Sequence, residues 1–241
     1  HVPMMEYYPE EAVKTNIMGT YNVLSSATTY KAQRCILIST DKAVNPTNVM
    51  GATKRVAEKI ARMLSTPETE IIAVRFGNVL GSRGSMLPLF LEQMNNGIPI
   101  TVTDKNIIRY FMTIREAVSL VFQAGSLGKG GEVMVLDMGE PVNIYDFAKK
   151  LVKYFGDGRS DVVITGLRPG EKLYEEKLSD HDNTIATDNP KVYKAKVNGS
   201  FDRETFESFY TQIPTLTPEE IVAQVQSFVP EFTRPGIHIV G

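Results

Sequence analysis

Four adjacent residues, Ser39-Thr40-Asp41-Lys42, bring two hydroxyls, a carboxylate and an amine together in one short segment. The segment directly follows the apolar run 36–38, which is typical of a parallel strand buried on both faces. Ligands of open α/β sheets lie outside the carboxyl ends of the strands. We therefore predict a site of proton transfer here, because a neighbouring carboxylate and amine can serve as acid and base. Without that position, an Asp-Lys pair is more often a solvated loop pair.

The elements that must position this segment alternate along the chain. Helical spacing of apolar residues predicts helices at 10–30, 50–64, 88–96, 114–124 and 144–155, and a capped helix that follows Thr217. Apolar runs predict strands at 36–38, 71–76, 100–102 and 133–136. Such alternation favours a parallel sheet with right-handed crossovers. We expect an α/β fold: the C-terminal portion of a Rossmann-like doubly wound parallel sheet plus a smaller α/β substrate-binding lobe.

Composition argues against several classes of function. The 241 residues are 42% hydrophobic and 22% charged, as in ordinary globular proteins. The formal charge of -2 and the pI of about 6.0 give no reason to expect nucleic acid or an anionic membrane as a partner. One cysteine, Cys35, and three scattered histidines leave no internal disulfide and no metal-ligand cluster to expect. No apolar stretch is long enough to span a bilayer, so we expect a cytoplasmic protein.

Several motifs together identify a family. The run from Ser39 to Arg55 resembles the active-site segment of the UDP-N-acetylglucosamine 4,6-dehydratases of bacterial capsule, O-antigen and protein-glycosylation pathways. Further stretches are similar to the same family in the same order: 75–85, 109–112, 136–141 and 166–175. The resemblance covers residues 1 to 178 and implies the short-chain dehydrogenase/reductase superfamily.

One position departs from the superfamily pattern. These proteins usually carry Tyr-x-x-x-Lys on the helix after the loop, so that one helical turn sets both side chains on one face. This chain has Met50 and Lys54. A thioether cannot exchange a proton with a substrate. Similarity to the configuration-retaining, membrane-anchored branch of the family, which also carries methionine there, implies a triad of Thr40, Asp41 and Lys42 instead.

The resemblance implies an internal oxidation and reduction with bound NAD. Hydride leaves C4 of the sugar, the ketone acidifies the C5 proton, water leaves from C6, and the hydride returns to C6. Thr40 would hold the C4 hydroxyl and Lys54 would hydrogen-bond the nicotinamide ribose, with Ser39 and Met50 also on the cofactor side. The group that takes the C4 hydroxyl proton is left open.

Elimination of water needs a base at C5 and an acid at the C6 hydroxyl. Lys42 and Asp41 can supply them if burial favours the neutral forms of both groups. Their opposite charges favour the ionised forms. We therefore expect desolvation to outweigh the attraction between them.

Arginines are expected to hold the nucleotide diphosphate, because a planar guanidinium binds two phosphate oxygens. Arg109 and Arg168 are assigned this role. The resemblance implies that Asn78 and the loop Arg83-Gly84-Ser85 line the UDP-sugar cleft, and that Glu171 accepts from a ribose hydroxyl. Without the resemblance, Arg83 and Arg109 are equally well explained as surface charges, and Arg168-Pro-Gly-Glu171 as a turn.

The sequence has no glycine-rich turn between a strand and a helix, the feature that cradles a dinucleotide pyrophosphate. The glycines of 125–131 follow a helix and precede a strand, which is the reverse order, and we expect a loop there. We expect 1–82 and 111–156 to form a partial NAD-binding lobe whose N-terminal half lies outside this chain. The UDP-sugar lobe is expected at 83–110 and 157–241.

The implied partners are a UDP-sugar, NAD and further copies of the chain, with membrane attachment only through a segment outside it. Two rival functions stay open. A UDP-sugar 4-epimerase would use the same bound NAD but needs no C5 base and no C6 acid. A non-catalytic sugar-nucleotide sensor or scaffold would have kept the fold after losing the tyrosine.

The first prediction concerns the cofactor. The chain alone should bind NAD weakly or not at all, because the pyrophosphate cradle is lacking from its sequence. Titration calorimetry with NAD measures this. Fusion of a glycine-rich dinucleotide-binding half ahead of His1 should restore binding, whereas tight retention of NAD by the isolated chain would contradict the prediction.

Overall fold

The computed structural model of the chain describes residues 1–156, 160–175, 178, 183–197 and 202–234. Its main sheet has the strand order β1-β2-β6-β10-β9. The strands are β1 (Arg34–Ile38), β2 (Glu70–Arg75), β6 (Val133–Leu136), β10 (Val192–Ala195) and β9 (Thr184–Ala186). β1, β2 and β6 are parallel, which confirms the sheet predicted from their apolar runs. β10 and β9 extend it in antiparallel fashion.

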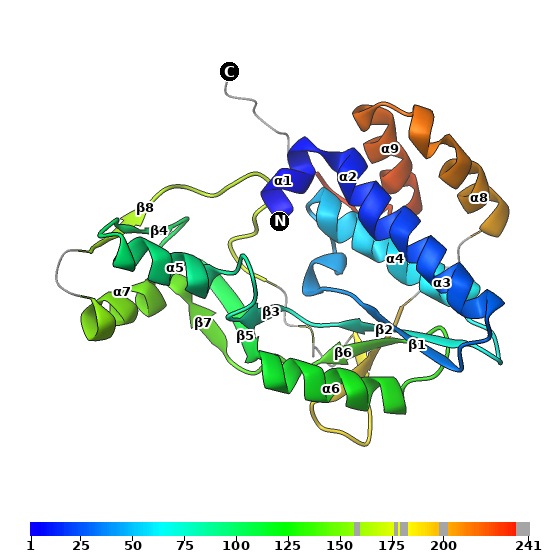
Figure 1. The fold of residues 1–241 in the computed structure, drawn as a ribbon, viewed down its shortest axis with the longest axis horizontal. Helices are drawn as coiled ribbons and strands as arrows, with labels where there is room; N and C mark the ends of the chain where they lie inside the picture. The colour runs from blue at the N-terminus through cyan, green and yellow to red at the C-terminus, as the bar shows by residue number, and fades with distance from the viewer. Residues whose placement is uncertain (157–159, 176–177, 179–182, 198–201, 235–241) are drawn as a thin grey trace.

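One face of this sheet is covered by helices from both ends of the chain (Figure 1). They are α1 (Val2–Tyr7), α2 (Pro9–Val13), a π-helical turn (Lys14–Gly19), α3 (Thr20–Thr29), α4 (Val49–Leu64), α8 (Arg203–Gln212), a 3-10 turn (Ile213–Thr215) and α9 (Pro218–Phe228). Val56 and Ile60, one turn apart on α4, share a fully buried cluster with Phe206 of α8. In the described part of the chain, no helix is long and apolar enough to cross a membrane.

The opposite face of the sheet is covered by α6 (Ile114–Leu127). Thr113 and Glu116 form a capping box at its start, each side chain accepting from the other residue's backbone N–H. Gly125 allows a close approach to β1, because a Cβ there would lie 2.2 Å from Cδ1 of Ile36. Helices therefore cover both faces of a mainly parallel sheet, and the predicted Rossmann-like α/β fold is confirmed.

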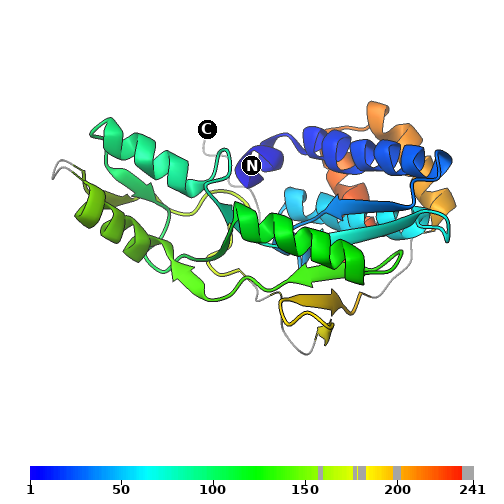
Figure 2. The same cartoon turned by 60° about the horizontal axis from the view of Figure 1, so that its bottom comes forward.

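A smaller lobe lies beside the main sheet (Figure 2). Its elements are α5 (Met86–Asn95), β4 (Ile100–Val102), α7 (Ile144–Phe155) and β8 (Val162–Ile164). Phe90, Ile100 and Leu151 belong to its separate buried core. A three-stranded sheet connects the lobes, formed by β3 (Asn78–Leu80), β5 (Ile108–Thr113) and β7 (Pro141–Asn143).

The elements divide between the lobes differently from the predicted boundaries. Helix α7 was expected with the main sheet, but Ile144, Ala148 and Leu151 pack in the core of the smaller lobe. The described residues of 183–232 were expected in the smaller lobe, but β9 and β10 join the main sheet and α8 and α9 cover α4. The reason is hydrophobic, because the apolar stripe of α4 would face solvent without the tail. The aromatic residues of α8 and α9 bury it.

The second prediction tests this tail. Phe206→Ala should lower the free energy of unfolding by about 3–5 kcal/mol, because a completely buried ring that contacts Tyr21 and Phe228 is removed. Urea denaturation measures the change. Phe122→Ala is the matched control, since that ring is 72% exposed on α6, and it should change stability by less than about 0.5 kcal/mol. Equal effects would show that α8 is not docked as described.

Candidate active site

The predicted chemical segment continues directly from β1 into a 3-10 turn, Asp41–Ala43. A backbone hydrogen bond of 3.1 Å from Asp41 N to Phe76 O holds it beside the end of β2. Thr40 begins the turn: its hydroxyl accepts from Lys42 N and donates to Asp41 Oδ1 at 2.8 Å. The segment therefore lies at the carboxyl ends of two adjacent parallel strands, where ligands of such sheets bind.

Helix α4 is anchored against this turn. Asn48 caps the helix by accepting from Gly51 N at 2.8 Å, and its amide donates to Gly170 O at 3.1 Å. Gly51 must be glycine, because a Cβ there would lie 2.1 Å from Lys42 O. The first turn of α4 and the loop that carries Lys42 thus fix each other's position.

Lys42 lies between two buried carboxylates. Its Nζ is 2.9 Å from Asp41 Oδ1 and 2.9 Å from Glu175 Oε1. Burial alone would lower the pKa of Lys42, but the two negative charges and their hydrogen bonds outweigh it and raise that pKa. The expectation that desolvation would win is therefore wrong for Lys42, because it has two charged partners instead of one. Lys42 is an ammonium in this arrangement.

Glu175 is a site residue that sequence reasoning missed. Its Oε2 accepts from Asn78 Nδ2 at 3.0 Å, and its Oε1 lies 3.3 Å from Arg109 Nε as well as next to Lys42. Burial and then the charge of Asp41 raise the pKa of this carboxyl against the opposing effect of the cations. Lys42 is 133 positions away in sequence, so no local pattern announces the contact.

Ser39 belongs to a second buried ionic cluster centred on Glu58 of α4, which the sequence also did not reveal. Ser39 Oγ donates to Glu58 Oε1 at 2.6 Å, and Arg75 binds both carboxylate oxygens at 2.6 and 2.5 Å. Burial alone would raise the pKa of Glu58, but Arg75, Arg55 and the Ser39 hydroxyl hold it below its usual value. The cluster ties α4 to the ends of β1 and β2. A carboxylate on the buried face of an amphipathic helix was the available signal.

Met50 and Lys54 lie one turn apart on α4, as the spacing predicts. Lys54 Nζ donates to Ile38 O at 3.2 Å, at the end of β1. Burial lowers the pKa of this lysine, with only a partial counter-effect from Glu58. An amine with donors to spare therefore lies next to the strand end.

A cavity of about 510 Å³ lies between the lobes and collects most of the predicted ligand-binding residues. Its lining includes Lys42, Asn78, Arg83, Gly84, Ser85, Arg109, Arg168, Glu171 and Glu175. The lining does not include Ser39, Thr40, Asp41, Met50 and Lys54. The structure thus brings the predicted substrate residues together with Lys42, one member of the predicted triad, whereas Thr40 and Asp41 lie outside this lining.

Arg109 is engaged within the protein. Its guanidinium donates to the backbone oxygens of Ile108 and Lys172, each at 2.8 Å. Its Nη2 lies 3.3 Å from Glu171 Oε1, and its Nε lies 3.3 Å from Glu175 Oε1. It therefore pins the segment 168–175 to β5 and does not present a free fork to the cavity. The side chain of Arg168 is 60% exposed and contacts only Glu171 among the ion pairs of the described residues.

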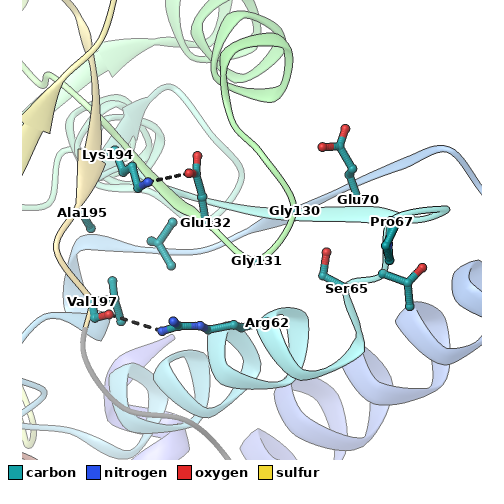
Figure 3. A pocket seen from close by; sticks show the side chains of 12 residues that line it. Arg62, Ser65, Pro67, Glu70, Gly130, Gly131, Glu132, Lys194, Ala195 and Val197 are labelled. Atoms are coloured by element: carbon teal, nitrogen blue, oxygen red, sulfur yellow. Dashed lines mark hydrogen bonds and ion pairs between the residues drawn. The ribbon is translucent and has the colours of Figure 1, made fainter.

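A larger hollow of about 660 Å³ lies elsewhere, at the amino ends of β2 and β6 (Figure 3). Lys194 pairs with Glu132 on its wall, and Arg62 donates to Val197 O. It contains none of the predicted site residues and lies at the end of the sheet where ligands of α/β folds do not bind. The smaller interlobe cavity is therefore the candidate active site.

The architecture and the helix that carries Met50 and Lys54 define a Rossmann-type α/β protein of the short-chain dehydrogenase/reductase class. Pen from Bacillus thuringiensis has a similar structure, with a TM-score of 0.75 and 36% identity over 84% of this chain and 64% of that one. The dTDP-glucose 4,6-dehydratase DesIV from Streptomyces venezuelae, solved with NAD and TYD bound, has the same fold with a TM-score of 0.64 and 18% identity, over 96% of this chain and 70% of that one.

The chain belongs to the polysaccharide biosynthesis protein family, whose model matches residues 1–197. It is 54% identical over 202 residues to the capsular polysaccharide biosynthesis protein CapD of Staphylococcus aureus, which covers 82% of this chain and 34% of the relative. The chain thus spans about a third of the length of that relative.

The third prediction concerns the Glu58 cluster. Glu58→Gln should lower the free energy of unfolding at neutral pH by about 3 kcal/mol, because Arg75 and Arg55 lose a buried counter-charge. Since the folded-state pKa of Glu58 is lowered, its stabilisation is present above the unfolded pKa and disappears as the pH falls through the folded value. The gap between wild type and variant should therefore close in acid.

Denaturant unfolding over a pH series measures this gap. Glu70→Gln makes the same chemical change in the solvent-exposed pair with Arg34 and should alter stability little at any pH. A gap for Glu58→Gln that stays constant with pH would contradict the ionic account of the cluster.

Proposed function

We propose that the chain is the catalytic part of an NAD-dependent lyase that converts UDP-N-acetylglucosamine to its 4-keto-6-deoxy product for bacterial polysaccharide biosynthesis. The observation that carries the proposal is Lys42 on the wall of the interlobe cavity, held between two carboxylates. Elimination of water needs such an acid and base, and the superfamily's tyrosine position is Met50 here.

The residues fit one end of NAD. Within the described part of the chain, the Lys54 amine donates to Ile38 O alone, so it retains donors for the nicotinamide ribose. Ser39 directly follows the end of β1, and Met50 lies one turn before Lys54 on α4. When bound, NAD would take hydride from C4 and return it to C6. The main-sheet lobe would hold this cofactor.

The smaller lobe would hold the UDP-sugar. Ser85 Oγ is buried in the described structure without a hydrogen-bond partner, and it lines the cavity beside Arg83 and Gly84. A bound diphosphate would supply the acceptor that this hydroxyl lacks. Exposed Arg83 and Arg168 are the cations free to meet it, whereas Arg109 positions Glu171 and its segment.

The protein's own groups would divide the proton transfers as follows. Lys42, held as an ammonium, donates a proton to the C6 oxygen as water leaves. A carboxylate beside it accepts the proton from C5. Thr40 orients Asp41 through their 2.8 Å hydrogen bond, and Asp41 in turn keeps Lys42 charged.

A UDP-sugar 4-epimerase is the nearest rival, and UDP-glucose 4-epimerases are among the relatives of the chain. An epimerase transfers hydride at C4 only, so it has no use for an ammonium between two buried carboxylates. A non-catalytic scaffold would need buried ion pairs only for stability, as in the Glu58 cluster, whose carboxylate does not line the cavity. Lys42 and Glu175 both line the cavity, which favours the dehydratase.

The fourth prediction tests this choice. The fusion described above, supplied with NAD, should convert UDP-N-acetylglucosamine to a product lighter by one water, which mass spectrometry detects. Lys42→Met should reduce the rate by roughly 10²–10⁴-fold, because the proton donor is lost.

Lys149→Met is the control. That lysine is exposed on α7 over the ring of Tyr145, so its loss should leave turnover unchanged. Product of unchanged mass would support the epimerase, and full activity of Lys42→Met would support neither enzyme mechanism built on this residue.

A further inference from the structure

Two carboxylates contact Lys42, but they occupy different places. Both side chains are almost fully buried, with 5% of Asp41 and 4% of Glu175 exposed, but Asp41 does not line the interlobe cavity. Its Oδ1 is used by the Thr40 hydroxyl and by Lys42, and its Oδ2 lies under Gly77, where a Cβ would come within 3.3 Å. Glu175, in contrast, lines the cavity together with Lys42. The carboxylate with access to a bound sugar is therefore the one supplied by the distant segment.

The surroundings of Glu175 suit proton exchange. Oε1 is shared by Lys42 and Arg109, while Oε2 accepts only the neutral amide of Asn78. Burial raises the pKa of Glu175, so a proton on this carboxyl costs less free energy than it does in water. The 2.9 Å contact with Lys42 provides a direct path for a proton between the two groups.

We propose that Glu175 is a catalytic carboxylate that accepts the C5 proton, with Lys42 as its proton-donating partner. The proposal rests on the proposed dehydration of a UDP-sugar and names a group that the predicted triad of Thr40, Asp41 and Lys42 does not contain.

The step balances as follows. Once C4 is a ketone, the C5–H bond breaks, its proton goes to Glu175, and its electron pair forms the C5=C6 double bond. The C6–O bond breaks, and the oxygen leaves with a proton from Lys42 as water. When C6 receives the hydride that bound NAD would return, Glu175, whose proton exchanges with solvent, protonates C5. The C4 hydroxyl gives up its proton to solvent during the oxidation, and Lys42 regains a proton from solvent.

A purely positioning role for Glu175 is the competing explanation, since it also holds Lys42 and Arg109. Glu175→Gln separates the two. The amide keeps the shape, Lys42 keeps Asp41, and Arg109 keeps Glu171 and its backbone acceptors, so the variant retains most of the local contacts. Thermal melting verifies that it folds.

The fifth prediction is a split between reaction steps. In D₂O with UDP-N-acetylglucosamine, the NAD-loaded fusion carrying Glu175→Gln should still oxidise C4, seen as absorbance of bound reduced nicotinamide within about tenfold of the wild-type rate. Incorporation of deuterium at C5 and loss of water should fall by roughly 10²–10⁴-fold, because the proton acceptor is gone. A group that only positions substrate would slow both steps together.

Glu171→Gln is the matched control, because Glu171 also pairs with Arg109 but, among the described residues, forms no ion pair with Lys42. It should weaken substrate binding without selectively blocking exchange at C5. The proposal is overturned if Glu175→Gln exchanges C5 at the wild-type rate, if Asp41→Asn alone abolishes that exchange, or if Glu171→Gln reproduces the split. Absence of water loss in the NAD-loaded fusion with the wild-type sequence would instead overturn the proposed dehydration itself.

Discussion

The ammonium of Lys42 between Asp41 and Glu175 is the interaction on which the site depends. A buried charge is tolerated only when it is paired and hydrogen-bonded. Here the two carboxylates stabilise the Lys42 ammonium, and the ammonium in turn stabilises both carboxylates. Asp41 belongs to the turn after β1, whereas Glu175 belongs to the segment that Arg109 pins to β5. The ion pairs therefore connect the main sheet to the connecting sheet through the groups that we propose to react.

The Glu58 cluster solves a different problem at the same end of the sheet. Its carboxylate is saturated by Arg75, Arg55 and Ser39, so its charge is neutralised within the protein and has no opening to the cavity. It holds α4 and the ends of β1 and β2 rigid. A fixed backbone here is what allows the neighbouring Lys42 network to stay close to the geometry that proton transfer requires.

The sequence predicted features whose cause is local and missed those whose cause is distant. Apolar runs revealed β1, β2 and β6 because full burial of a parallel strand imposes its own composition. In helix α8, polar residues separate the aromatic ones, so the sequence of α8 does not reveal which surface it covers. That surface is the apolar stripe of α4, which α8 buries. In the site, residues 39–42 were recognisable at the end of a strand. Glu175 was not, because the contact with Lys42 arises from the path of the chain through the smaller lobe, and the internal partners of Arg109 were hidden for the same reason.

Replacement of tyrosine by Met50 has a consequence for how such a site can work. A tyrosine on α4 would exchange protons from the main-sheet lobe alone, with Lys54 one turn away to assist it. Lys42 and Glu175, the proposed acid and base, both line the cavity, and they are in contact because the segment 168–175 lies against the turn after β1. Proton transfer thereby becomes conditional on the two parts of the structure being in contact. Because Arg109 and the backbone of the same segment form part of the cavity wall, a ligand that settles this segment would also assemble the acid and base.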